Sequence, residues 1–216
     1  MIVKKAYARA GVDVDLANKL KRSIGAFVRQ THGPQVLGKI GGFGGLFHAS
    51  FPRMREPVLV ASVDGVGTKL KVAFAMDKHD TVGVDLVNHC VDDIAVLGAR
   101  PLFFLDYIGC ERLEPRVFQQ LLRGLSRACR AAGCALLGGE TAQMPGMYRK
   151  GEYDLAGCIV GVVDRPKIID GSKIKRGDIV LGLASNGLHT NGYSLARKIL
   201  FERMRLNQVR VYRDRQ

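Results

Sequence analysis

Apolar residues recur at helical spacing in three stretches of the chain, which predict three helices. The first runs from residue 13 to residue 31, with Asp13 or Asp15 available as its N-cap. The second spans residues 83–99 and sets an acidic face against an apolar one. The third spans residues 114–133, with a proline in its first turn and a glycine at its end. Each helix is therefore expected to bury one face.

Short apolar runs between these helices predict strands. The run 58–63 ends in a glycine turn, the run 100–109 closes on Asp106, and residues 153–164 form a further strand. Because strands and helices alternate, the predicted fold class is α+β or α/β, with a mixed sheet in the N-terminal part.

The composition changes to charged and turn residues near residues 165–178, which predicts a domain boundary. We expect an N-terminal domain over residues 1–165 and the start of a second α/β domain over residues 166–216. The second unit is predicted to open with a strand at 179–187 and to continue through a loop into a helix at 188–204. About 40 residues are too few to close a separate core. This second domain is therefore expected either to dock on the first domain or on a partner, or to be incomplete because the chain is a fragment.

Composition places the chain among globular proteins and argues against several other classes. Of the 216 residues, 47% are hydrophobic and 25% are charged, which is enough apolar material for a core. No apolar stretch has the length of a membrane span, and the first residues lack the apolar segment of a signal peptide. The five scattered cysteines form no CxxC pair and are interpreted as buried thiols. We expect a cytoplasmic protein that binds no membrane.

The net charge of +13 raises the question of an anionic partner. Much of the basic excess lies near the two ends of the chain, and no basic run is interleaved with aromatic residues. The central motifs are instead acidic and rich in glycine. We interpret the charge as a solvated basic surface and expect no nucleic acid partner.

Three glycine-rich turns follow apolar segments, at residues 41–45, 64–69 and 138–141. Glycine lets backbone N–H groups converge on an anion because no Cβ intervenes, so each turn could hold a phosphate. Each could equally be an ordinary turn after a strand. Neither the P-loop spacing nor GxGxxG is present, so a nucleotide site here would have another design.

Carboxylates cluster around these turns. A carboxylate about 4 Å from a phosphate oxygen would be repelled by on the order of 4 kcal/mol at an effective dielectric of 20. The two groups are compatible if a cation bridges them, and Mg²⁺ suits carboxylate, phosphate and water ligands. Helix capping or a solvated face is the alternative, and His89 is interpreted as a packed or surface histidine. The acidic residues in question are Asp64, Asp85, Asp92, Asp93, Asp106 and Glu140.

A last polar stretch, "SNGLHTNGYS" at residues 185–194, follows the predicted strand of the second unit. Its neutral donors and single histidine suit a sugar phosphate or an amide substrate. A polar loop with a helix cap is the alternative interpretation. His189 is a candidate acid or base, although no partner that would tune it is evident.

Taken together, the motifs resemble phosphoribosylformylglycinamidine cyclo-ligase, also called AIR synthetase, over about residues 7 to 204. Residues 205–216 read as a truncated end. The sequence departs from the family's usual pattern at Ala8, where a lysine is common, and at Asp92, where asparagine is common. The motifs that carry the resemblance are "YARAGVDVD", "GGFGGLF", "DGVGTKLK", "GVDLVNHCVDD", "GARPLFFLDYIG", "GGETAQMPGMY", "DLAGCIVGVVD" and "SNGLHTNGYSLARKI".

The resemblance implies ATP-dependent cyclisation of formylglycinamidine ribonucleotide to aminoimidazole ribonucleotide, with release of ADP and phosphate, in purine biosynthesis. It also implies a homodimer whose N-terminal domains share a β-barrel. Lys69, His189 and Asp106 are the candidate catalytic residues, and Asn186, His189 and Asn191 would contact the substrate. Asp64, Asp93 and Glu140 would hold Mg²⁺. The residues expected at ATP are Gly41, Gly42, Gly44, Gly45, Asp64, Gly65, Gly67, Thr68, Lys69, Gly138, Gly139, Glu140 and Thr141.

Three other hypotheses stay open. One is a related ATP-using enzyme such as a thiamine-monophosphate kinase, against which the motifs "GGETAQMPGMY" and "SNGLHTNGYS" argue. Another is an inactive fragment that still binds nucleotide or dimerises, favoured by the incomplete second domain. The third is a nucleic-acid-binding protein, which rests on charge alone.

Overall fold

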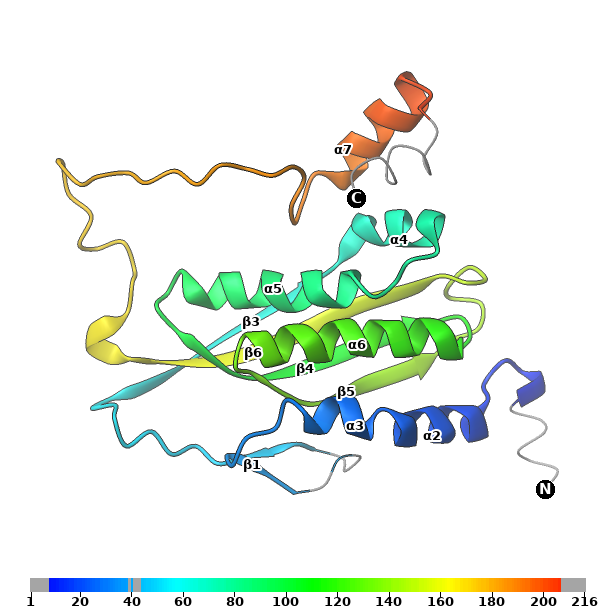
Figure 1. The fold of residues 1–216 in the computed structure, drawn as a ribbon, viewed down its shortest axis with the longest axis horizontal. Coiled ribbons are helices and arrows are strands. Elements are labelled where there is room, and N and C mark those ends of the chain that lie inside the picture. The colour runs from blue at the N-terminus through cyan, green and yellow to red at the C-terminus, as the bar shows by residue number, and fades with distance from the viewer. Residues whose placement is uncertain (1–7, 39, 41–43, 207–216) are drawn as a thin grey trace.

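The computed structural model of the chain describes residues 8–38, 40 and 44–206, and it is built around one four-stranded mixed sheet (Figure 1). The strand order is β3-β6-β4-β5, with β6 antiparallel to both of its neighbours and β4 parallel to β5. The strands are β3 (Pro57–Gly65), β4 (Arg100–Cys110), β5 (Ala135–Gln143) and β6 (Tyr153–Asp164). The prediction of a mixed α+β sheet is confirmed.

Two long helices, α5 (Val82–Ala95) and α6 (Pro115–Ala131), cover one face of this sheet (Figure 1). Both were predicted from the apolar periodicity. A side chain at Gly83 would overlap the carbonyl oxygen of Leu121, and one at Gly124 would overlap that of Asp80. These glycines therefore let the backbone of α6 approach α5 closely, over the buried core between helices and sheet.

The predicted helix over residues 13–31 is instead two helices, α2 (Val14–Ser23) and α3 (Gly25–Arg29). Asp13 is the N-cap as expected, and its carboxylate accepts a hydrogen bond from the Leu16 N–H at 2.9 Å. The helix breaks at Ile24, where Ser23 bonds back to the Leu20 carbonyl and a glycine follows. Apolar spacing continues across the break, which is why it was not predicted.

The second glycine motif has the expected form. β3 ends at Gly65, the 3₁₀ turn η1 (Gly67–Lys69) follows with Gly67 at φ +63°, and α4 (Leu70–Met76) begins directly after it. A left-handed φ of this kind favours glycine. The chain therefore turns sharply just after Asp64.

The third glycine motif was predicted as a turn, and this is wrong: residues 138–141 lie within β5. They pair in parallel with β4, Gly139 opposite Asp106 and Glu140 opposite Tyr107. A Cβ at Gly139 would overlap Asp106, so the glycine allows a close strand contact. β4 likewise continues past Asp106 to Cys110.

The expected strand at 179–187 is absent, and these residues have no regular structure. Their apolar side chains are solvent-exposed, reaching 99% for Leu183. A strand needs a neighbour for its hydrogen bonds, and this segment has none in the part of the chain described. The expected helix follows as α7 (Tyr193–Arg197) and a π-helical turn, η3 (Lys198–Arg203).

Short elements complete the fold. A two-stranded ribbon of β1 (Val36–Leu37) and β2 (Leu46–Phe47) forms a separate small sheet, and the Phe47 ring lies 5.3 Å from that of Phe103 on β4. The turn η2 (Arg165–Lys167) follows β6. Four cysteines are buried and Cys158 is half-buried, all as free thiols, which largely confirms their interpretation. Within residues 8–38, 40 and 44–206, no helix combines the length and apolar character that crossing a membrane requires.

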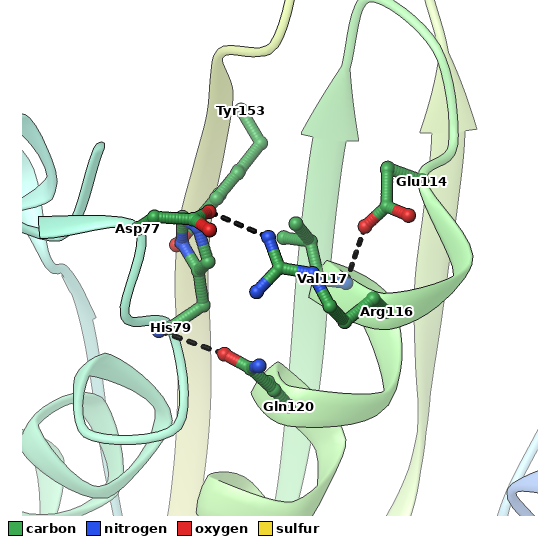
Figure 2. Close-up of polar contacts among 7 residues, drawn as sticks. All are labelled: Asp77, His79, Glu114, Arg116, Val117, Gln120 and Tyr153. Carbon is green, nitrogen blue, oxygen red and sulfur yellow. Dashed lines mark hydrogen bonds and ion pairs between the residues drawn. The ribbon is translucent and has the colours of Figure 1, made fainter. Parts of the chain in front are cut away.

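A polar network around the buried His79 joins the α4–α5 loop to α6 and β6 (Figure 2). Its Nδ1 lies 3.0 Å from the Tyr153 hydroxyl and its Nε2 lies 3.3 Å from Asp77 Oδ1. The His79 backbone N–H donates to Gln120 at 3.0 Å, and Arg116 donates to the Asp77 carboxylate at 2.5 Å. Three separate segments are thus tied together around one imidazole.

Candidate functional site

Asp64, the last acidic residue of β3, presents one carboxylate oxygen to its own turn and one away from it. Oδ1 accepts a hydrogen bond from the Gly65 N–H at 2.7 Å. Oδ2 lies 3.9 Å from His89 Nδ1, too far for a hydrogen bond. The Asp64 side chain is 39% exposed, so its carboxylate can be reached by a ligand.

Lys69, at the end of η1, is a buried cation with only 7% of its surface exposed. Its Nζ lies 3.3 Å from Asp85 Oδ2 and 3.3 Å from His89 Nε2, both on α5. The Tyr193 ring of α7 lies 5.2 Å from the same nitrogen. A buried ammonium needs such partners, because burial without them is strongly unfavourable. The charge is therefore held in a fixed place beside the glycine turn.

His89 connects Lys69 to Asp64 from α5, where it is 6% exposed. Burial, and then the nearby Lys69 charge, lower the pKa of His89 below its usual range, so the imidazole is neutral near pH 7. Its Nδ1 has no hydrogen-bond partner among the residues that the structure describes. A buried polar atom left in this way costs about 1–3 kcal/mol.

Asp93 lies on the same helix and near the same strand, since its Oδ2 accepts a hydrogen bond from Ser62 Oγ at 2.6 Å. Burial raises the pKa of Cys90 to about 12, and the negative charges of Asp64 and Asp93 add to this effect. The carboxylates of Asp64 and Asp93 therefore both lie near Cys90. Cys90 stays an unreactive thiol there.

Glu140 does not join this group within one chain. The register runs Asp64, Gly157, Asp106 and Gly139 across the sheet, whereas Glu140 pairs with Tyr107, one position along. Paired residues share a face and neighbours along a strand alternate, so Glu140 lies on the opposite face from Asp64. The two also lie on opposite edges, three strand spacings or roughly 14 Å apart. Among the described residues, no three His, Cys, Asp or Glu side chains form a group that could hold a metal by itself.

Lys69, Asp85 and Tyr193 line a cavity of about 250 Å³. A second cavity, of about 420 Å³, gathers other residues of the expected nucleotide set between α3, α6 and β5. Burial raises the pKa of Asp106 to about 7 here. No ion pair or hydrogen bond between described side chains connects Asp106 to Lys69 or His189. Gly41 and Gly42 lie outside the described residues. The expected residues that line this cavity are Gly44, Gly45, Asp106, Gly138, Gly139 and Thr141.

Two residues of the polar loop at 185–194, Tyr193 and Ser194, contact the first site. Ser194 Oγ donates to Thr68 Oγ1 at 3.0 Å, and Tyr193 stacks near Lys69 as described. His189 lies within 2.7 Å of Asn186 through Nε2, on an exposed stretch that also holds Asn191. The structure thus places His189 beside Asn186 and not beside Lys69.

Sequence reasoning missed two contributors to this site, Tyr193 and the close contact of Asp85 with Lys69. The i, i+4 spacing of Asp85 and His89 on one helix face was the available signal. It could not show that Lys69 sits against that face. His89 is packed, as interpreted, but in a position between two charged groups.

Comparisons with known proteins identify a matching family and similar sequences. The model of a family described as AIR synthase related protein, N-terminal domain, matches residues 50–163. The chain is 59% identical over 201 residues to a phosphoribosylformylglycinamidine cyclo-ligase of Anaeromyxobacter dehalogenans, covering 93% of this chain and 58% of that protein. It is 59% identical over 204 residues to the protein of the same name from Syntrophotalea carbinolica, covering 94% and 58%. The chain therefore spans somewhat more than half the length of these curated relatives.

Solved structures of lower identity share the fold. A thiamine-monophosphate kinase from Stenotrophomonas maltophilia aligns with a TM-score of 0.53 at 20% identity, over 68% of this chain and 42% of that one. The hydrogenase maturation protein HypE, in complex with ATP, aligns with a TM-score of 0.55 at 20% identity, over 80% and 46%. These likenesses show the architecture alone. Because the family model matches more than half of the residues, the chain belongs to the family of AIR synthase related proteins and carries that family's N-terminal domain.

Proposed function

We propose that the chain carries the ATP-binding part of an enzyme that cyclises formylglycinamidine ribonucleotide to aminoimidazole ribonucleotide, with release of ADP and phosphate. The names of relatives at 59% identity support this reaction. The structural observation that carries it is the buried Lys69 ammonium, held by Asp85 and His89 beside the glycine turn that follows Asp64. The ATP complex of HypE, which has a similar fold, supports the choice of nucleotide.

The chemistry of the reaction suits these residues. Transfer of the γ-phosphoryl group to the substrate's amide oxygen makes that oxygen a good leaving group; a nitrogen then attacks the same carbon, the ring closes and phosphate departs. Such a reaction depends on holding two substrates in line and on balancing phosphate charge. Lys69 offers a fixed positive charge, and the backbone N–H groups of the turn at Gly67 can approach phosphate oxygens closely.

The site offers two carboxylates that suit Mg²⁺, Asp64 and Asp93. Asp64 offers a carboxylate oxygen free of protein donors, Asp93 lies close by, and Mg²⁺ typically binds one or two carboxylates with phosphates and water. We assign Asp64 and Asp93 as the residues that would hold it, where it would neutralise phosphate charge. That Glu140 also binds the ion stays a prediction, because within one chain Glu140 lies on the other face of the sheet from Asp64.

His189, Asn186 and Asn191 are proposed to meet the ribonucleotide substrate. Their loop is exposed, and its end is anchored at the site through Ser194 and Thr68. The hydrogen bond between His189 and Asn186 pre-orients both side chains. Asp106, with its pKa raised to about 7 by burial, is proposed as a proton carrier at the second cavity. The residues 1–165 and 166–216 stay the proposed domains.

A homodimer is proposed through the face of the sheet that α5 and α6 leave uncovered. Alternate residues of β3 point to this face, and Leu59 and Val63 are 61% and 72% exposed. An apolar sheet face of this kind favours burial against a second copy, as in a shared barrel. Sedimentation equilibrium at micromolar concentration should give a dimer, and a Val63→Asp substitution should give a monomer. A monomeric parent chain would contradict the proposal.

Release of ADP tests the reaction itself. The purified 216-residue chain is incubated with Mg·ATP, with and without formylglycinamidine ribonucleotide, beside the variant Asp64→Ala. Substrate-dependent release that the variant loses is the expected result. A folded chain that releases none would contradict catalysis by this chain.

A second candidate is a nucleotide-binding unit without turnover. It is favoured by one observation: residues 179–187, which precede the proposed substrate loop, have no regular structure and expose apolar side chains such as Leu183. Tight binding of Mg·ATP without ADP release would identify it.

A further inference from the structure

His89 is the starting point, because its Nδ1 is the one buried side-chain nitrogen or oxygen without a partner among residues 8–38, 40 and 44–206. The ring lies on α5 between two charged groups of the proposed site. Lys69 Nζ is 3.3 Å from its Nε2, and Asp64 Oδ2 is 3.9 Å from its Nδ1. Buried polar atoms are usually paired, so an unpaired one calls for an explanation.

The contact with Lys69 determines which ring nitrogen carries the proton. An ammonium has three donors and no acceptor, so Nε2 of His89 must accept the hydrogen bond from Lys69. A neutral imidazole then carries its proton on Nδ1. The unpaired atom is therefore a donor, and it is directed to the side where Asp64 lies.

We propose that His89 is a positioning residue: Nε2 accepts from Lys69, and Nδ1–H donates to Asp64 Oδ2 when Mg·ATP binds. The inference rests on the proposed function, since Asp64 is a proposed cation ligand. The separation of 3.9 Å must shorten by about 1 Å to become a hydrogen bond, and the half-exposed Asp64 side chain is able to turn. Carboxylates that bind cations are commonly fixed by such outer hydrogen bonds.

A packing role alone does not account for this arrangement. An apolar side chain would fill the same space without burying an unpaired N–H. The other charges near the ring are Asp85, which pairs with Lys69 at 3.3 Å, and Asp92. Of the nearby carboxylates, Asp64 is the one within 4.0 Å of the imidazole in the described structure. The ring thus joins the proposed phosphate-binding cation to a proposed cation ligand.

Two substitutions separate the two halves of this role. In His89→Gln, the side-chain oxygen can reach the position of Nε2 and still accept from Lys69, but the Nδ1 donor is lost. In His89→Asn, the amide nitrogen takes the position of Nδ1 and can still donate toward Asp64, but the acceptor for Lys69 is lost. The two variants are similar in polarity, so a general loss of packing would affect both.

The experiment measures ATP affinity of the intact chain by calorimetry, once in EDTA and once with saturating Mg²⁺. The ratio of the two dissociation constants gives the enhancement by Mg²⁺. We expect His89→Gln to lower that ratio about tenfold while ATP affinity in EDTA stays within twofold. His89→Asn should keep the ratio within about threefold and weaken ATP binding in EDTA.

Equal ratios in parent and both variants, or equal losses in both variants, would overturn the inference while leaving the proposed function intact. A parent chain whose ATP affinity does not respond to Mg²⁺ would overturn both. The tautomer is tested without any variant, by the ¹⁵N shifts of the His89 ring in the unsubstituted chain. We expect a protonated Nδ1, and a protonated Nε2 with a bare Nδ1 would contradict the proposed role.

Discussion

The chain buries two histidines, His79 and His89, to nearly the same extent, but their rings differ in hydrogen bonding. His79 is 4% exposed and His89 is 6% exposed, and burial lowers the pKa of both. Both ring nitrogens of His79 have partners within the network of Figure 2. One ring nitrogen of His89 has no partner within the described part of the chain.

This difference separates a structural cluster from a candidate functional one. A fully paired network fixes its segments in place and leaves none of its own buried polar groups unsatisfied. An unpaired donor beside a half-exposed carboxylate costs stability in the free protein and becomes useful when a ligand draws the two groups together. The two histidines are therefore distinguished by whether each ring nitrogen has a hydrogen-bond partner, rather than by burial or residue type.

The largest effect is expected from removing His79. In His79→Leu, the Tyr153 hydroxyl and the Asp77 carboxylate lose a buried partner, which should lower the free energy of unfolding by about 2–4 kcal/mol. ATP affinity of the folded fraction should change less than twofold. Urea unfolding measures the free energy of unfolding, and calorimetry measures ATP affinity. A weakened ATP affinity at unchanged stability would mean that His79, and not His89, is the functional histidine.

Replacing Lys69 should weaken ATP binding strongly and change stability little. Lys69→Met keeps much of the side-chain volume but removes the charge, so ATP affinity should fall about 10- to 100-fold, or 1.4–2.7 kcal/mol. The midpoint of thermal unfolding should move by only a few degrees, since the buried charge is removed together with its desolvation cost. Lys173→Met, which removes a charge from an exposed lysine in the segment after β6, is the matched control.

The pH dependence should reveal the structural histidine. The pKa of His79 in the folded chain lies below its ordinary 6.5, with burial as the main cause. The unfolded state therefore binds more protons below pH 6.5, so stability is present above that pH and is lost as the pH falls toward the folded-state pKa. The slope for this one group is at most about 1.4 kcal/mol per pH unit. His79→Gln should flatten the slope between pH 6.5 and 5, and an unchanged slope would contradict the assignment.

The smallest effect is expected at Asp85. Its carboxylate is 36% exposed and pairs with Lys69, so solvent screens part of the interaction. Asp85→Asn retains an acceptor for Lys69 and should reduce stability by about 1 kcal/mol or less. ATP affinity should rise slightly, because a negative charge near the phosphates is removed. A loss as large as that of Lys69→Met would place Asp85 among the essential residues.

Much of the fold could be predicted from periodicity. The bounds of β6 and the existence of α5 and α6 follow from strong apolar patterns and from helix-end residues such as Pro115. Periodicity did not reveal the register shift beside Phe104 and Leu105, because two leucines follow one another in β5 there. That shift decides which face Glu140 occupies.

The candidate site was predictable in its residue types and only partly in its geometry. The glycine turn after Asp64 and the importance of Lys69 could be inferred from the motif at residues 64–69. Which groups meet depends on pairing between distant segments, such as Lys69 with α5 or Ser194 with Thr68. No local pattern encodes those contacts, so His89 could be recognised as packed but not as a bridge between charges.

The most direct test of this account is one calorimetric measurement: the effect of Mg²⁺ on ATP affinity in the parent chain, His89→Gln and His79→Gln. We expect Mg²⁺ to strengthen ATP binding in the parent and in His79→Gln alike, and about tenfold less in His89→Gln. Equal Mg²⁺ responses in all three folded chains, or an equal loss in both variants, would contradict the division between a structural and a functional histidine.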